Sequence, residues 1–157
     1  IAAPAFDADS AYAYIAQQVA FGPRVPNTPE HVACGDWLSR ELTRHGADVI
    51  EQPGLVRAYD GTILRIRNFI GQFRPENRER ILLFAHWDTR PFADKDTLRM
   101  REPIDGANDG GSGVGVLLEI ARLLGADSTL DVGVDIIFSM PRIMAPPSGV
   151  RKTKTPP

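Results

Sequence analysis

The feature that most constrains the fold is a pair of continuously apolar segments on either side of an amphipathic helical segment. The apolar segments are RILLFAH, residues 80–86, and VGVDIIF, residues 132–138. Such segments are typical of parallel strands that are covered on both faces. The helical segment between them, SGVGVLLEIARLLG, completes a βαβ unit with a right-handed crossover. We therefore expect an α/β fold in which both strands end at one sheet edge, where ligands bind in parallel sheets.

The upstream residues indicate further elements of the same domain. Asp9 or Ser10 can cap a first helix, and Thr28 followed by Pro29 is a start signal for a second helix. The turn Asp60-Gly61 separates two segments with the alternating pattern of strands. The predicted elements are helices over residues 7–22 and 29–46 and two strands within residues 47–73.

Composition excludes several classes of function. A chain of 157 residues that is 43% hydrophobic is long enough for one domain with a core. It has 18 basic and 20 acidic residues, so it lacks the excess of positive charge on which nucleic-acid binding rests. No apolar segment approaches the roughly 20 residues that a membrane-spanning helix needs. We therefore expect no nucleic-acid partner and no transmembrane segment.

Three side chains near the predicted sheet edge have the chemistry of a metal site. His86 and Asp88 follow the first strand two residues apart, so in extended backbone they point to the same side. Asp109 lies in GANDGGSG, where the glycines let the backbone pass close to a ligand. Histidine nitrogen and carboxylate oxygen are ordinary zinc ligands. Taken singly, each motif also fits a hydrogen-bonded strand end or a turn, whereas their convergence on one edge favours a site.

Several longer motifs resemble the bacterial glutaminyl cyclases, which belong to the superfamily of zinc-dependent aminopeptidases. The motifs are FGPRVPNTPEH, LLFAHWDTRPFADKD and PIDGANDGGSGVGVLLEIARLL, and the resemblance runs from about residue 6 to 138. It implies a single α/β domain with a mixed, largely parallel sheet flanked by helices. It also implies one catalytic zinc ion and the conversion of N-terminal glutamine to pyroglutamate.

The resemblance assigns roles by position. Asp109 matches the aspartate that binds zinc, and we rank His86 second as a metal ligand. In the two-zinc aminopeptidases the residue equivalent to Asp109 bridges both ions and the histidine is also a ligand, whereas in the cyclases this histidine is not expected to bind the zinc directly. We expect Asp88 to orient a ligand through a hydrogen bond.

The residues that would complete the family's site are not found after Phe138. The family has Phe-Asp-Ala-Glu-Asp-Tyr-Gly there, and its glutamate supplies a zinc ligand or the acid/base group. This chain instead has SMPRIMAPP, and its charged residues beyond that point are basic. With a suitable choice among synonymous codons, a shift of one base restores the acidic motif, and Met140-Pro141 requires an alanine codon in the neighbouring frame whichever codons are chosen. We predict that residues 1–138 are the N-terminal portion of the domain and that residues 139–157 are a disordered, frameshift-derived tail; a natural basic, Pro-rich tail is the alternative.

The leading hypothesis is an N-terminal fragment of a zinc-dependent glutaminyl-peptide cyclotransferase, itself inactive. Its partner would be a peptide or protein with N-terminal glutamine, and the resemblance implies export to the periplasm or lipid anchoring at the cell envelope. Two alternatives stay open: a two-zinc aminopeptidase of the same superfamily, and a non-catalytic binding domain that keeps the fold.

Overall fold

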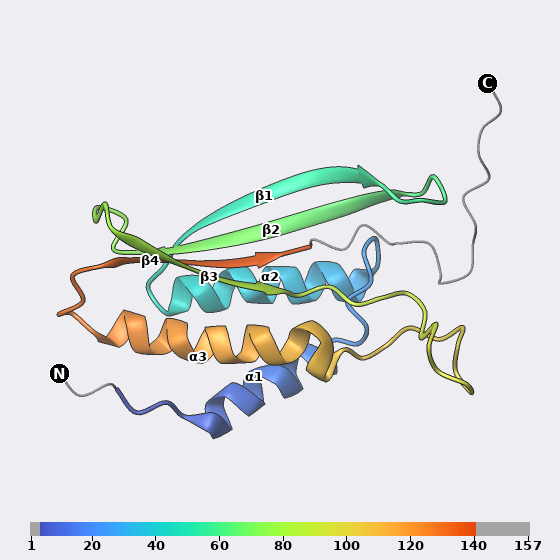
Figure 1. Ribbon diagram of the computed structural model, residues 1–157, viewed down its shortest axis with the longest axis horizontal. Helices are drawn as coiled ribbons and strands as arrows, with labels where there is room; N and C mark the ends of the chain where they lie inside the picture. Colours follow the sequence, from blue (N-terminus) through green and yellow to red (C-terminus); the bar gives the residue numbers. More distant parts are fainter. Residues whose placement is uncertain (1–3, 141–157) are drawn as a thin grey trace.

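The computed structural model describes residues 4–140 of the chain, and these form a four-stranded sheet with three α-helices on one side of it (Figure 1). Helices α2 and α3 pack against the sheet, and α1 packs chiefly against α3. The elements are α1 Ala8–Ala20, α2 Pro29–Arg44, β1 Asp48–Arg57, β2 Ile63–Phe73, β3 Arg80–His86, a short π-helical turn Ala107–Gly111 (η1), α3 Ser112–Ala126 and β4 Gly133–Ser139.

The first two helices begin at side-chain caps. Asp7 caps α1 by accepting hydrogen bonds from the backbone N–H groups of Asp9 and Ser10, so the predicted cap at Asp9 or Ser10 was two or three residues late. The side chain of Thr28 accepts the N–H of His31 and so caps α2, as predicted. These caps satisfy N–H groups that have no partner within the first turn of a helix.

The sheet is mixed, with the strand order β1-β2-β4-β3. Strands β1 and β2 form an antiparallel hairpin, as the turn at Asp60-Gly61 predicted, and β4 pairs antiparallel with β2 on its other side. Strand β3 pairs parallel with β4, which confirms the predicted βαβ unit. Within residues 4–140 this is the only parallel pair, and the other two pairings are antiparallel. The described residues therefore show a mixed sheet, as expected, but not a largely parallel one.

The hydrophobic core fills the space between the sheet and the helices. On the sheet side, Phe69, Phe138 and Trp87 are fully buried, and Leu38 and Leu118 meet them from α2 and α3. Burying an aromatic or aliphatic side chain of this size contributes about 1.5–3 kcal/mol. The core therefore fixes β4 and the chain just after β3 against the helices.

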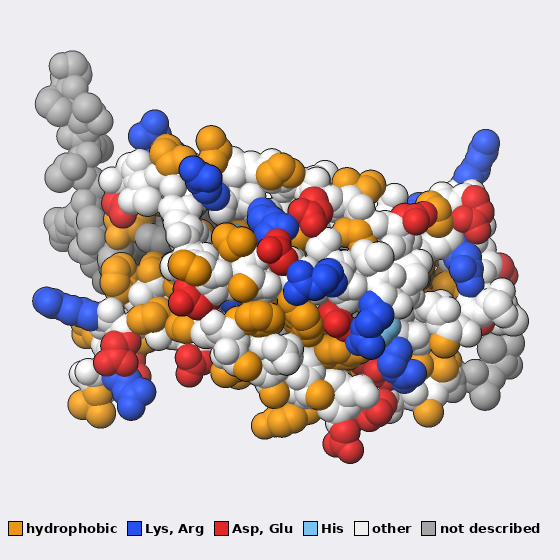
Figure 2. Space-filling model, turned by 180° about the vertical axis from the view of Figure 1, so that it is seen from behind, with side chains coloured by type: hydrophobic (Ala, Val, Ile, Leu, Met, Phe, Trp, Pro, Cys, Tyr) orange, Lys and Arg blue, Asp and Glu red, His pale blue; other side chains and the backbone are white. Residues whose placement is uncertain are grey.

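The opposite face of the sheet is uncovered by the described residues. Because Ile50 pairs with Ile70, Ile70 with Ile137 and Phe84 with Ile137, one apolar row crosses all four strands. We call these four residues the apolar row; Phe84 and Ile50 in it are 55% and 46% exposed. Hydrophobic side chains line the upper edge of the molecule in Figure 2, on the side where Figure 1 places the sheet. The prediction that β3 is covered on both faces was therefore wrong for residues 4–140, because the helices described there all lie on one side.

The described chain ends shortly after β4. Ser139 is the last residue of β4, and Met140 is buried with 8% of its surface exposed. The remaining residues of the predicted tail, 141–157, lie outside the described residues. The frameshift origin and the disorder of residues 139–157 stay predictions.

Candidate metal centre

The parallel pairing of β3 and β4 brings the ends of the two strands to one edge. His86, the last residue of β3, pairs with Ser139, the last residue of β4. The next backbone N–H, that of Trp87, still donates to the Ser139 carbonyl at 3.2 Å. Both apolar strands therefore end at the same edge of the sheet, as their sequences predicted.

The turn η1 brings Asp109 to this edge. Asp109 has φ −82° and ψ 96°, and Gly110 has φ 92°, so the helical backbone is interrupted at these two residues just before α3 begins. Gly110 adopts the left-handed region that glycine tolerates without a steric penalty. A Cβ atom at Gly110 would lie 2.9 Å from Cε1 of His86, which shows how closely the turn passes the imidazole.

His86 lies between two carboxylates. Its Nε2 is 3.1 Å from Oδ1 of Asp109, and its Nδ1 is 3.5 Å from Oδ1 of Asp88. The Asp88 side chain is 5% exposed, whereas those of His86 and Asp109 are 21% and 33% exposed. The structure thus places Asp88 behind the imidazole and leaves the pair of His86 and Asp109 accessible from solvent.

The accessible pair fits two ligands of one zinc ion. Zinc lies about 2.1 Å from nitrogen and oxygen ligands in a tetrahedral site, so two such ligand atoms are about 3.4 Å apart. The observed distance of 3.1 Å between Nε2 and Oδ1 needs only a small side-chain adjustment to match. Asp88 has the place of the carboxylate that commonly orients a metal-binding histidine through its other ring nitrogen.

A complete site requires more than these two ligands. Among residues 4–140 the structure brings no group of three or more His, Cys, Asp or Glu side chains together in a metal-binding arrangement. A catalytic zinc site normally uses three protein ligands and one open position. The roles of Asp109 and His86 as ligands therefore stay predictions.

His31 lies in the core next to this site. The imidazole is 2% exposed and stacks on the indole of Trp87 with ring centroids 4.2 Å apart. Its Nε2 is 3.1 Å from the sulfur of Met140. Burial lowers the pKa of His31 to about 4, with Asp88 and Arg67 as smaller and opposing influences. His31 lies at helical spacing before Cys34 and Leu38 on the buried face of α2, and this spacing is the sequence signal that could have indicated its burial.

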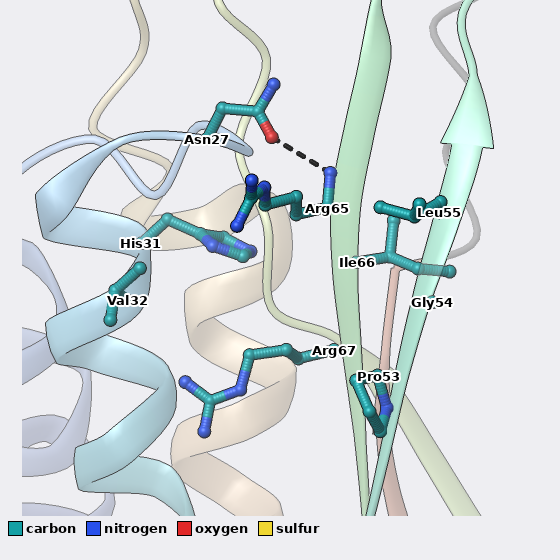
Figure 3. A pocket seen from close by; sticks show the side chains of 9 residues that line it. All are labelled: Asn27, His31, Val32, Pro53, Gly54, Leu55, Arg65, Ile66 and Arg67. Atoms are coloured by element: carbon teal, nitrogen blue, oxygen red, sulfur yellow. Dashed lines mark hydrogen bonds between the residues drawn. The ribbon is translucent and has the colours of Figure 1, made fainter.

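A cleft of about 810 Å³ lies between α2 and the β1–β2 hairpin, and His31 is one of the residues that line it. Figure 3 shows His31 pointing from α2 toward the strands, and a hydrogen bond of 2.8 Å from the Arg65 N–H to Asn27 at one end of the cleft. His86, Asp88 and Asp109 do not line it. The cleft and the candidate metal centre are therefore separate features.

The sequence profile of peptidase family M28 matches residues 68–140. These residues include the second half of β2, all of β3 and β4, and the whole candidate metal centre. This part of the chain therefore has the sequence profile of the M28 peptidases.

Solved structures narrow this class. The glutaminyl cyclase of Bacteroides thetaiotaomicron, bound to N-acetylhistamine, is 53% identical with a TM-score of 0.91, and that of Tannerella forsythia is 54% identical with a TM-score of 0.91. A Zn-dependent exopeptidase from Parabacteroides distasonis is 57% identical with a TM-score of 0.90. Each similarity covers 96% of this chain and 52% of the other chain. The chain is therefore similar in sequence and fold to bacterial glutaminyl cyclases and to a related exopeptidase, and it spans about half their length.

Among curated protein sequences, none matches the chain. Within residues 4–140, no helix has both the length and the apolar content that crossing a bilayer requires.

Proposed function

We propose that the chain is the N-terminal part of a zinc-dependent glutaminyl-peptide cyclotransferase. This enzyme would convert the N-terminal glutamine of a peptide into pyroglutamate and release ammonia. The observation that carries the proposal is the pairing of His86 with Asp109 at the strand edge, in a chain 53–54% identical to two glutaminyl cyclases. The uncovered apolar row supports the view that a longer protein completes the fold.

Each residue of the centre has a role in this proposal. Asp109 holds the metal through its carboxylate, and Asp88 fixes the orientation of His86 beside it. When bound, zinc polarises the γ-amide carbonyl of the substrate. The α-amine forms a bond to that carbonyl carbon, the bond to the amide nitrogen breaks, and a proton passes from the amine to the departing ammonia. A carboxylate suits this proton transfer, and we assign it to the part of the parent protein that follows Phe138.

The chain by itself is inactive in this proposal, because two ligands do not make a catalytic zinc site. We also propose that residues 139–157 are the product of a frameshift. The pairing of Ser139 with His86 supports this, since an acidic segment translated there would begin beside the metal centre. Sequencing the source DNA across the Phe138 codon tests it, and an uninterrupted frame with good coverage would rule it out.

The second candidate is a two-zinc aminopeptidase. The similarity to the Parabacteroides distasonis exopeptidase favours it, as does the position of His86, from which the imidazole can reach a metal bound to Asp109. A non-catalytic binding domain is the remaining possibility from another class. We further propose that the parent protein is exported to the periplasm or the cell envelope, which cell fractionation tests.

One experiment separates these functions. The frame-restored, longer protein is incubated with a peptide that begins with glutamine, and products and bound metal are measured. The cyclotransferase yields a cyclised peptide with its backbone intact and holds one zinc, whereas the aminopeptidase yields free amino acids and holds two. Asp109→Ala should abolish both zinc retention and activity. Asp127→Ala is the matched control, because this aspartate lies at the far end of α3. Normal activity of the Asp109 variant would refute the site.

A further inference from the structure

Arg24 is a fully buried arginine in the loop that follows α1, with 0% of its surface exposed. Among the described residues it forms no ion pair with a carboxylate. Burying a charged group without compensation is costly, so its hydrogen bonds must satisfy it. The acceptors of these hydrogen bonds therefore indicate the role of Arg24.

The guanidinium donates to backbone carbonyls from both sides of the candidate metal centre. On the β3 side, Nε donates to the carbonyl of Trp87 at 3.2 Å. On the Asp109 side, Nη1 donates to Asp105 at 2.6 Å and Nη2 donates to Gly106 at 2.9 Å. The first segment carries His86 and Asp88, and the second leads into η1. Arg24 thus joins two segments that are separated by a long excursion of the chain.

Backbone contacts at the same place tighten this connection. The carbonyl of Arg24 accepts the N–H of Thr89 at 3.1 Å, and the Gly106 carbonyl also accepts the N–H of Gly111 at 3.0 Å. A Cβ atom at Gly106 would lie 2.4 Å from the side chain of Thr89 and 3.0 Å from Nη2 of Arg24. The two segments therefore meet directly against the guanidinium, with no space for a side chain between them.

We propose that Arg24 is a positioning residue that sets the distance between His86 and Asp109. It acts through the backbone and touches neither metal nor substrate. The proposal deepens the proposed function and rests on the same metal centre. Only a planar guanidinium can reach these separate carbonyls at once, since lysine offers a single ammonium group on a flexible stem. The planar shape of the arginine side chain is therefore required at this position in addition to its positive charge.

The test uses the 157-residue chain without metal and compares Arg24→Met with Arg80→Met. Arg80 is a matched control, because it also donates to several backbone carbonyls but lies at the opposite end of β3. NMR records the contact between the His86 ring and the Asp109 β protons, together with hydrogen exchange of the Thr89 and Gly111 amides. Arg24→Lys provides a milder second variant in case Arg24→Met does not fold.

We expect both Arg24 variants to lose the contact between His86 and Asp109. Exchange of the Gly111 amide should accelerate about tenfold or more relative to amides of β2 and β4, as expected when hydrogen bonds from a charged donor are lost. Arg80→Met should keep the contact between the His86 ring and Asp109. It should not accelerate exchange of the Gly111 amide relative to the amides of β2 and β4. If the Arg24 variants keep both the contact and the relative protection of Gly111, Arg24 is only a structural residue and the proposal fails. Because the readout requires neither zinc nor turnover, it is independent of the outcome for the proposed function.

Discussion

Gly110 lies against the imidazole of His86, so closely that a Cβ atom there would be 2.9 Å from Cε1 and 3.0 Å from Nδ1 of the ring. Its φ of 92° is also unfavourable for any residue with a side chain. We expect Gly110→Ala to push the imidazole away from Asp109 and to lower the free energy of unfolding by about 1–3 kcal/mol. Chemical denaturation and the NMR signals of the His86 ring measure the two effects.

Gly61 is the matched control for that substitution. It has φ of 89°, and a Cβ atom there meets nothing within 4 Å. Gly61→Ala therefore introduces the same backbone strain without the contact, and it should leave the His86 signals unchanged. Equal effects of the two variants on the His86 ring would contradict the close approach of the turn to the imidazole.

The buried His31 makes stability depend on pH. Burial lowers the pKa of its imidazole from 6.5 to about 4 in the folded chain. Protonation therefore favours the unfolded state, so this contribution to stability is complete above pH 6.5 and is lost as the pH falls toward 4. The loss should be at most about 1.4 kcal/mol per pH unit. Urea unfolding at a series of pH values measures it.

A phenylalanine at position 31 isolates this effect from that of other groups. His31→Phe keeps an aromatic ring against Trp87 but cannot take up a proton. The difference in unfolding free energy between the original chain and the variant should therefore change steadily between pH 6.5 and 4. A constant difference over this range would show that His31 is not buried in its neutral form.

The single cysteine should be unreactive in the folded chain. Cys34 is 0% exposed, and burial raises the pKa of its thiol to about 12. Because the thiolate is the reactive form, both factors suppress reaction with an aromatic disulfide reagent such as DTNB. At pH 8 we expect slow labelling that follows unfolding, and complete labelling in concentrated guanidinium. Equally fast labelling with and without denaturant would contradict the described packing of α2.

Two phenylalanines test which face of the sheet is covered. Phe138 is fully buried under the helices, whereas Phe84, in the apolar row, is 55% exposed. Phe138→Ala should reduce the free energy of unfolding by about 3–5 kcal/mol. Phe84→Ser should change it by less than about 1 kcal/mol and should reduce self-association, which sedimentation measures. A large loss of stability in the Phe84 variant would mean that this face is covered.

The sequence predicted the elements of the fold better than their environment. Thr28 and Pro29 gave the start of α2 to the residue, because capping is a local interaction. The apolar segment at 80–86 correctly indicated a parallel strand, yet Leu82 and Phe84 in it are exposed among the described residues. Hydrophobicity reports what a strand can bury, and whether a covering layer is present depends on residues far away in the chain.

Two residues of the candidate metal centre were predictable from the sequence, whereas the buried arginine that contacts the backbone around them was not. His86 and Asp109 are recognisable by residue type and by their places at the ends of elements, and the structure brings them to 3.1 Å. His31 continues the helical spacing of the buried residues Cys34 and Leu38 in α2, whereas Arg24 carried no such signal. The burial of Arg24 arises from contacts with distant backbone, such as the carbonyl of Trp87, 63 residues away in the sequence. Such long-range contacts leave no periodic pattern.

The strand order has a consequence for how the chain is made. Strand β4 is the last described strand, yet it lies between β2 and β3, which are synthesised earlier. During synthesis on the ribosome, β2 and β3 must therefore wait with unpaired edges until residue 139 has emerged, while the β1–β2 hairpin can form early from local contacts. Completing the sheet is a late, long-range step, and the nascent chain is most exposed to wrong strand pairing just before it.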